Sequence, residues 1–175
     1  MKTLFKFIFA LTVLIGCKEK QTVEINTPAE VEREKQMTAD IADQHFIDGM
    51  TGKIWHNYLE VKMALTNSDA DQVQDIAASM ADTFTEERGL MKALAEKMSE
   101  TDDITVLRGL FSKFTEEVGP MFENALSGGT IYKMYCPMAL DDTGAYWYAS
   151  VKEINNPYMG EGMPECGSVV KTITK

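Results

Sequence analysis

The chain has 175 residues, 45% apolar and 25% charged, with 5 prolines and 12 glycines. This composition excludes collagen-like and broadly disordered proteins. The 27 acidic residues outnumber the 17 basic ones, whereas nucleic-acid binding needs a cationic surface, so we expect no nucleic-acid partner. A mean hydropathy of −0.19, with its one long apolar run at the N-terminus, argues against a polytopic membrane protein.

The first sixteen residues have the pattern of a bacterial export signal. Lys2 and Lys6 precede the short apolar run 7–15, and Gly16 and Cys17 follow it. The run is too short for a comfortable membrane-spanning helix. The four residues that end at Cys17 resemble the lipobox, in which the signal is removed and the cysteine is lipidated. The alternative is an ordinary cleaved signal or an uncleaved anchor, with Cys17 incidental.

We therefore predict a signal peptide at 1–16, lipidation at Cys17, a tether at 17–46 and a folded domain at 47–175. Residues 18–43 mix Glu, Lys, Gln and Thr with few large apolar side chains, which is typical of a solvated linker. The predicted location is the bacterial cell envelope, where the lipid holds the domain on the membrane and the domain faces the periplasm or the cell exterior.

Three stretches of the domain carry apolar residues at helical spacing. The apolar positions are Ile47, Ile54, Tyr58, Val61 and Leu65 in the first stretch, Val73, Ala77, Met80, Phe84, Met91, Leu94 and Met98 in the second, and Leu107, Phe111, Phe114, Val118, Phe122 and Ala125 in the third.

Three amphipathic helices predict a mainly α protein, an antiparallel three- to four-helix bundle. The second stripe continues across Gly89, which predicts one long helix or two collinear pieces. We expect Pro120 to kink or restart the third helix. Met80, Met91 and Met98 lie on the stripe, so we assign them to the core rather than to a ligand site.

After residue 126 the chain changes in character. Residues 127–175, the C-terminal cap, hold three of the five prolines and six of the twelve glycines, so we expect an irregular segment. Its two ends, 131–135 and 169–174, could pair as two short strands.

The C-terminal cap also concentrates sulfur. In an extended chain, Met134, Cys136 and Met138 point to the same side. Thiolate and thioether are the soft donors that select Cu(I) over hard cations, so the sequence predicts a soft-metal site. The candidate metal ligands are Cys136, Cys166, Met134, Met138, Met159 and Met163.

A disulfide competes with the metal. In an oxidising envelope, Cys136 and Cys166 form an even pair, and the sequence spacing does not distinguish a disulfide from a metal site. Closing their 30-residue loop would stabilise the cap by about 3 to 4 kcal/mol on the chain-entropy model. His45 and His56, if both lay on one helix, would be about 16 Å apart and could not share an ion. We expect both histidines to be exposed.

The sequence offers little support for a catalytic function. The sequence contains no CxxCH, HExxH or GxSxG motif and no glycine-rich loop between a strand and a helix. We therefore expect a protein that is not an enzyme.

Four motifs in the cap agree in order with a known family. They are Tyr135-Cys136-Pro137-Met138-Ala139, Gly144-Ala145-Tyr146-Trp147, Lys152-Glu153-Ile154-x-Asn156-Pro157-Tyr158-x-Gly160 and Met163-x-x-Cys166-Gly167.

Together with the helical region before them, these motifs resemble a bacterial family of unknown function. Its members occur as small exported or lipid-anchored proteins and as an extra domain on periplasmic adaptor subunits of heavy-metal efflux pumps of the resistance-nodulation-division type. The resemblance covers about residues 49–170 and departs at Met159, where an aromatic residue is usual. It implies a link to copper or other heavy-metal handling and does not identify the ligands.

Two functions follow as hypotheses. In the first, an envelope lipoprotein binds or delivers a soft metal ion, Cu(I) above all, beside an efflux system, with Trp147 and Tyr158 packed to shield the site. In the second, a non-catalytic interaction module with a structural Cys136–Cys166 disulfide docks its acidic helices onto an efflux adaptor or pump subunit.

Overall fold

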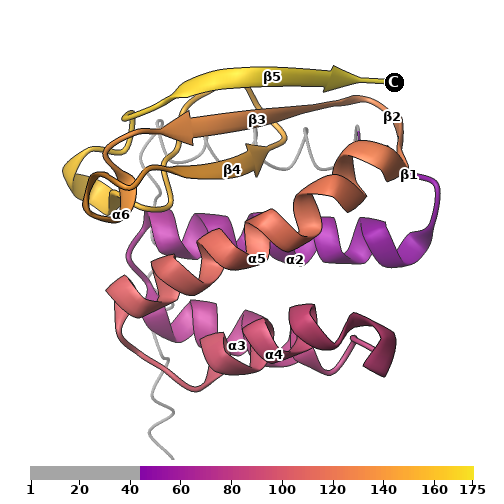
Figure 1. Cartoon of the computed structure of the whole chain (residues 1–175), viewed down its shortest axis with the longest axis horizontal. Helices are drawn as coiled ribbons and strands as arrows, with labels where there is room; N and C mark the ends of the chain where they lie inside the picture. The colour runs from indigo at the N-terminus through magenta and orange to yellow at the C-terminus, as the bar shows by residue number, and fades with distance from the viewer. Residues whose placement is uncertain (1–43) are drawn as a thin grey trace, which may run out of the picture.

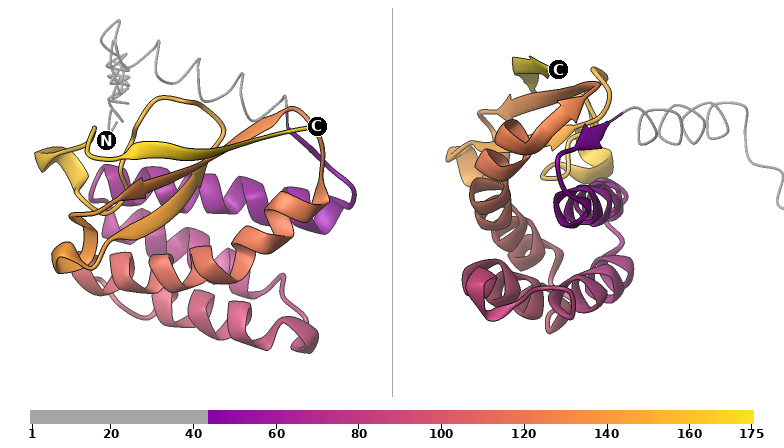
Figure 2. Two further views of the ribbon diagram at one scale, coloured as in Figure 1. Left: turned by 45° about the horizontal axis from the view of Figure 1, so that its top comes forward. Right: turned by 90° about the vertical axis from the view of Figure 1, so that its right-hand side faces the viewer.

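The computed structural model describes residues 44–175, and these fold in three layers. A small sheet covers helices α2 and α5, and helices α3 and α4 lie on their other side (Figures 1 and 2). The prediction of a mainly α, antiparallel bundle is confirmed. The predicted signal 1–16, Cys17 and most of the predicted tether lie outside the described residues.

Helix α2 (Gly49–Thr66) begins at an N-cap, Asp48, whose carboxylate accepts the backbone N–H of Thr51 at 2.8 Å. Ile47 therefore precedes the helix, and it is 74% exposed, so its assignment to the first apolar face was wrong. The two residues His45 and Phe46 form strand β1, which pairs antiparallel with β2 (Leu126–Gly128). The described fold thus starts on the N-terminal side of residue 47.

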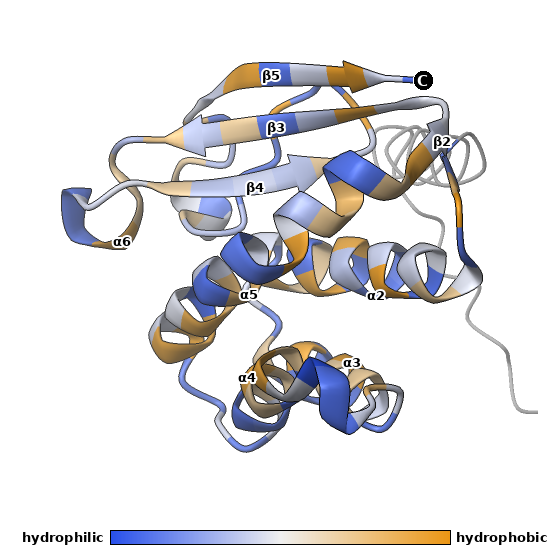
Figure 3. Cartoon of the chain, turned by 45° about the vertical axis from the view of Figure 1, so that its right-hand side comes forward, coloured by the Kyte–Doolittle hydropathy of each residue, from blue (hydrophilic) through white to orange (hydrophobic). Residues whose placement is uncertain are grey.

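Helices α3 (Ala70–Ala81) and α4 (Gly89–Ser99) form an antiparallel hairpin, joined through the 3-10 helix η1 (Glu86–Arg88). The Gln74 side chain near the start of α3 donates to the Ser99 carbonyl at the end of α4, at 3.3 Å. The prediction of one long helix or two collinear pieces is therefore wrong. The turn is hydrophilic (Figure 3), and the Thr83 hydroxyl donates to the Met80 carbonyl at 2.7 Å, which helps to end α3.

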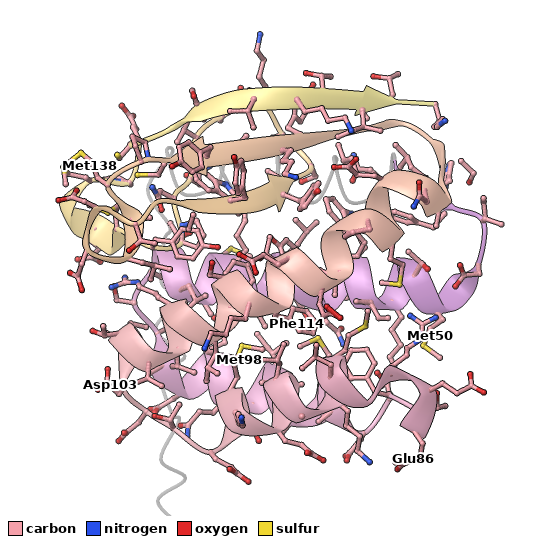
Figure 4. All side chains as sticks on the ribbon, viewed as in Figure 1. Met50, Glu86, Met98, Asp103, Phe114 and Met138 are labelled. Carbon is pink, nitrogen blue, oxygen red and sulfur yellow. The ribbon has the colours of Figure 1, made fainter. Side chains whose placement is uncertain are left out.

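Helix α5 (Ile104–Ala125) runs through Pro120 without restarting. The carboxylate of Asp103 caps its start by accepting the N–H groups of Thr105 and Val106 at 2.8 and 3.2 Å. Its buried face carries the predicted residues of the third apolar stretch except Ala125, which is only partly buried. Phe114 and Met98 point into the space between the two helix pairs (Figure 4).

The core assignment of the methionines holds for Met80 and Met98, which are fully buried, while Met91 is partly buried against the same cluster.

One buried residue is charged: Lys62 on α2 is 3% exposed and makes no ion pair within residues 44–175. Burial lowers the pKa of its ammonium to about 8. Among residues 44–175, no helix is both long and apolar enough to cross a bilayer.

The sheet has the order β4-β3-β5 and is antiparallel. The two predicted strands are confirmed as β3 (Thr130–Cys136) and β5 (Ser168–Thr174), which pair with each other. The third strand, β4 (Ala145–Ala149), was not predicted and pairs with the other edge of β3.

Two tyrosine hydroxyls occupy the outer edge of β4. The backbone N–H of Tyr148 donates to the Tyr58 hydroxyl on α2 at 3.0 Å, and the Tyr158 hydroxyl donates to the Tyr146 carbonyl at 2.6 Å. An edge strand otherwise presents unpaired backbone groups. These two contacts satisfy two such groups on β4, and the one from Tyr58 fixes the sheet onto the bundle.

Candidate functional site

The strand register brings the two cysteines of the cap together. In the β3–β5 ladder Tyr135 lies opposite Ser168, so the residues just beyond, Cys136 on one strand and Gly167 on the other, meet at the same end of the sheet. Cys166 directly precedes Gly167 in the sequence, and its Sγ lies 2.9 Å from the Sγ of Cys136. The structure has both as free thiols. We call these two residues the sulfur pair.

One thioether joins the sulfur pair. The Sδ of Met138 lies 3.9 Å from the Sγ of Cys166. Met138 follows Pro137, which cannot donate to a ladder and ends β3. Its side chain is 47% exposed at the tip of the molecule (Figure 4). The local donor set is therefore two thiols and one thioether.

The other candidate ligands lie in different surroundings. Met134 is fully buried on β3, Met159 is partly buried against the core, and Met163 is 42% exposed. The Met163 carbonyl accepts the backbone N–H of Cys166 at 3.2 Å. None of these three side chains makes a hydrogen bond to either cysteine. Within residues 44–175, no three His, Cys, Asp or Glu side chains gather as they would around a metal ion.

The sulfur pair differs in exposure and in its surroundings. Cys136 is fully buried, whereas Cys166 is partly exposed. The hydrogen bond with Cys136 raises the pKa of the Cys166 thiol, with a smaller contribution from burial. Both thiols must lose their protons before they can bind a metal.

Asn156 fixes the backbone on which Cys166 stands, a role that the sequence patterns did not reveal. Its side-chain amide is fully buried and donates to the Cys166 carbonyl at 2.6 Å. Its side-chain oxygen accepts the backbone N–H of Tyr158 at 2.8 Å, and its own N–H donates to the Pro164 carbonyl at 2.8 Å. The Asn156-Pro157 pair is a turn signal in the sequence, but its partners could not be inferred from it.

Arg108 of α5 ties the same part of the cap to the bundle. Its guanidinium donates to the Pro157 carbonyl at 3.0 Å and, on the other side, to the Ser68 hydroxyl at 3.1 Å. Gly160 packs against it: a Cβ there would stand 2.5 Å from the guanidinium, and the backbone φ is +56°. We call residues 150–167 the return segment. The polar side chains of Asn156, within the segment, and of Arg108, on α5, hold it in place.

Trp147 and Tyr158, the predicted shielding pair, pack edge to face with ring centroids 6.1 Å apart. Trp147 is fully buried and lies against Gly167, where an added Cβ would come within 2.7 Å of the indole and where φ is +132°. Only glycine suits this position. The indole therefore packs directly beside the backbone that carries Cys166.

A left-handed turn follows the thioether. The short element α6 (Ala139–Asp142) contains three consecutive residues with positive φ: Leu140 at 53°, Asp141 at 55° and Asp142 at 62°. Such backbone costs roughly 1–2 kcal/mol per non-glycine residue. Hydrogen bonds from the next two N–H groups, of Thr143 and Gly144, to carbonyls of the turn hold it closed. This strained turn directs the chain from Met138 back into β4.

The two histidines lie apart from the sulfur pair. His45 is on β1 and His56 on α2, and both are exposed, as predicted. The imidazole of His56 is 3.5 Å from the carboxylate of Glu60.

Comparison with known proteins identifies part of the bundle. Residues 54–128 match the model of a family described as a protein of unknown function (DUF3347). The matched region runs from α2 to β2 and ends before β3, so it holds neither cysteine of the sulfur pair. No curated protein and no solved structure matches the chain.

Proposed function

We propose that this protein binds or delivers a soft metal ion, with Cu(I) as the favoured cargo, through Cys136, Cys166 and Met138. The observation that supports the proposal is the gathering of these three sulfurs at one tip of the molecule, with Sγ–Sγ and Sγ–Sδ separations of 2.9 and 3.9 Å. Thiolate and thioether ligands favour Cu(I), whereas hard cations prefer oxygen.

The geometry fits an ion after a small movement. Two sulfur ligands at about 2.3 Å from one ion stand roughly 3.7 Å apart or more, so the sulfur pair must open by about 1 Å from its 2.9 Å contact. Cys166 is the side chain that can move, because it is partly exposed in a turn while Cys136 is buried in β3. Met138 and Met163, both exposed, are accessible to an acceptor protein with soft ligands of its own.

The cellular setting is proposed from the sequence. The predicted signal and lipobox support an envelope lipoprotein attached to the membrane at Cys17. The resemblance of the cap motifs supports a role beside a heavy-metal efflux adaptor or pump subunit, whereas the DUF3347 match names only a family of unknown function. We propose a carrier and not an enzyme.

Competition titration with a chromogenic Cu(I) chelator tests the proposal. The full chain with Cys17→Ser, so that only the sulfur pair reacts, is reduced without oxygen and titrated. We expect one tightly bound Cu(I), protection of both thiols, and weaker loading in acid. Cys136→Ser and Cys166→Ser should each lower affinity by about 100-fold, or roughly 2.7 kcal/mol.

A matched pair of thioether variants sharpens the test. Met138 and Met163 are similarly exposed, but only Met138 hydrogen-bonds with a cysteine sulfur. Met138→Leu should therefore lower Cu(I) affinity about tenfold, and Met163→Leu should change it little. Absence of Cu(I) uptake by the fully reduced protein would reject the metal proposal.

The same 2.9 Å contact also favours the rival function, an interaction module closed by a disulfide. A thiol count on the freshly isolated, unreduced protein separates the two. Two reactive thiols support a metal carrier, whereas a count of zero, with no Cu(I) uptake after reduction, leaves the docking module.

A further inference from the structure

The two thiols of the sulfur pair differ in their access to solvent. Cys136 is fully buried in β3, where its backbone pairs with Ala145 of β4. Cys166 is partly exposed in the turn that precedes β5, and its backbone is held by Met163 and Asn156. A molecule that arrives from solvent therefore meets the sulfur of Cys166 first.

The two sulfurs are also at reaction distance. Groups poised to react stand about 3–3.5 Å apart, and the two Sγ atoms are separated by 2.9 Å. A bond formed at Cys166 would at once have a second thiol beside it. The backbone of Cys166 is fixed by Asn156, so the second step needs only a small side-chain rotation.

We propose that the sulfur pair is a thiol–disulfide exchange site for low-molecular-weight disulfides, with Cys166 as the entering thiol and Cys136 as the resolving thiol. In the first step the Cys166 sulfur attacks a disulfide RSSR. The S–S bond of RSSR breaks, a Cys166–SR bond forms, and one RS⁻ leaves and takes up a proton.

In the second step the Cys136 sulfur attacks the Cys166 sulfur. The Cys166–SR bond breaks, the Cys136–Cys166 disulfide forms, and the second RS⁻ leaves and is protonated. The pair loses two electrons and two protons, and RSSR becomes two RSH. A dithiol reductant reverses both steps.

This exchange would regulate the soft-metal site, a consequence that rests on the proposed function. A metal needs both thiolates free, so oxidation of the sulfur pair removes its two strongest donors and leaves the thioether of Met138 alone. The oxidised form should release its cargo, and reduction should restore binding.

Oxidised glutathione is the probe. The full chain with Cys17→Ser is reduced and incubated with it, and the products are followed by intact mass and thiol titration. The parent protein should lose both thiols together without accumulating a glutathione adduct. Cys136→Ser should trap a stable adduct on Cys166, and Cys166→Ser should react at least about tenfold more slowly, because its remaining thiol is buried.

A second measurement needs no substitution in the pair. Brief alkylation of the reduced native protein, followed by peptide mapping, should label Cys166 before Cys136. Equal labelling of the two, or equal reactivity of the two serine variants towards oxidised glutathione, would overturn the assignment of entering and resolving thiols.

Cu(I) titration of the same samples separates this inference from the proposed function. If the protein binds Cu(I) but does not react with oxidised glutathione, the exchange site is rejected and the carrier stands. If it exchanges but takes up no Cu(I) when reduced, the carrier is rejected and the exchange site stands. Undiminished Cu(I) binding by the oxidised protein would refute the regulatory link.

Discussion

Apolar side chains fill the space between the helices, whereas the return segment is held to its neighbours by a few polar groups. In the bundle, aromatic and aliphatic residues from α2, α3, α4 and α5 form one continuous buried cluster. In the cap, Asn156 and Tyr158 each donate to a backbone carbonyl, and Arg108 of α5 donates to a third, that of Pro157. Packing of this kind tolerates exchange of similar side chains, but a buried hydrogen bond fails when one partner is removed.

The largest effect should come from the bundle. Phe114 is fully buried and packs edge to face on Phe84 with ring centroids 6.2 Å apart. Phe114→Ala should lower the free energy of unfolding by about 3–5 kcal/mol, through lost burial and the cavity left behind. Chemical denaturation measures the loss. Leu90→Ala, at a site 58% exposed, should change it by less than about 0.5 kcal/mol, and an equal effect would contradict this view of the core.

Replacement of Lys62 should have the opposite effect and raise the free energy of unfolding, because a buried charge without an ion pair destabilises the bundle. Its folded pKa is lowered by burial to about 8 from 10.5, which corresponds to roughly 3 kcal/mol. Lys62→Met should therefore stabilise the protein by up to about 3 kcal/mol at pH 7. Thermal or chemical unfolding at a series of pH values measures it.

The lowered pKa of Lys62 determines how the stability of the protein changes with pH. Between about pH 8 and pH 10.5, the Lys62 side chain is protonated in the unfolded chain but has lost its proton in the folded chain. The free energy of unfolding of the parent protein therefore rises with pH across this window. The advantage of Lys62→Met should shrink over the same range. Lys97→Met, at an exposed site on α4, is the control, and a pH-independent gain at position 62 would contradict the burial explanation.

Removal of the Tyr58 hydroxyl should weaken the attachment of the cap to the bundle. The Tyr58 hydroxyl contacts the Thr115 hydroxyl and the Tyr148 N–H, each at 3.0 Å. Tyr58→Phe leaves both groups without this partner and should cost about 1–3 kcal/mol. Amide hydrogen exchange at Tyr148 should accelerate. Tyr132→Phe serves as the control, because its partly exposed ring makes no hydrogen bond in the described chain.

The smallest effect should be a gain in the cap. Asp142 is exposed with φ of 62°, where glycine is free of the steric cost, so Asp142→Gly should stabilise the protein by about 1 kcal/mol. Asp75→Gly, in the right-handed backbone of α3, should destabilise it by about 0.3 kcal/mol, the difference in helix propensity between the two residues. Denaturation midpoints of the two variants measured together should move in opposite directions.

The contrast between the regions also explains what the sequence could predict. Helical spacing located the buried faces because burial imposes a period on the chain. It missed the turn between α3 and α4, since Phe84 and Met91 keep that spacing across residues that are not helical. It missed β4 because three consecutive residues, Trp147, Tyr148 and Ala149, are all buried, which removes the alternation that marks a strand.

For the candidate site, the even pair of cysteines and the concentration of soft donors in the cap predicted that Cys136 and Cys166 share a site. The role of Asn156 could not be predicted, because its partners are backbone groups, which every residue possesses. Met159 and Met163 were named for their chemistry alone and Met134 also for its alternation with Cys136, and only the fold shows that Met134 is a buried core residue.

The sulfur pair and the chain termini of the described domain occupy opposite ends of β3. Gln44 donates to the Thr130 carbonyl at 3.1 Å, and Lys175 donates to the Gly129 carbonyl at 3.1 Å, both beside the first residue of the strand. The seven residues of β3 span roughly 20 Å before Cys136 is reached. The two ends of the described domain therefore lie at one end of the sheet, and the sulfur pair lies at the other (Figure 1). A support joined on the N-terminal side of Gln44, or a tag added after Lys175, would leave the sulfur pair accessible to other molecules.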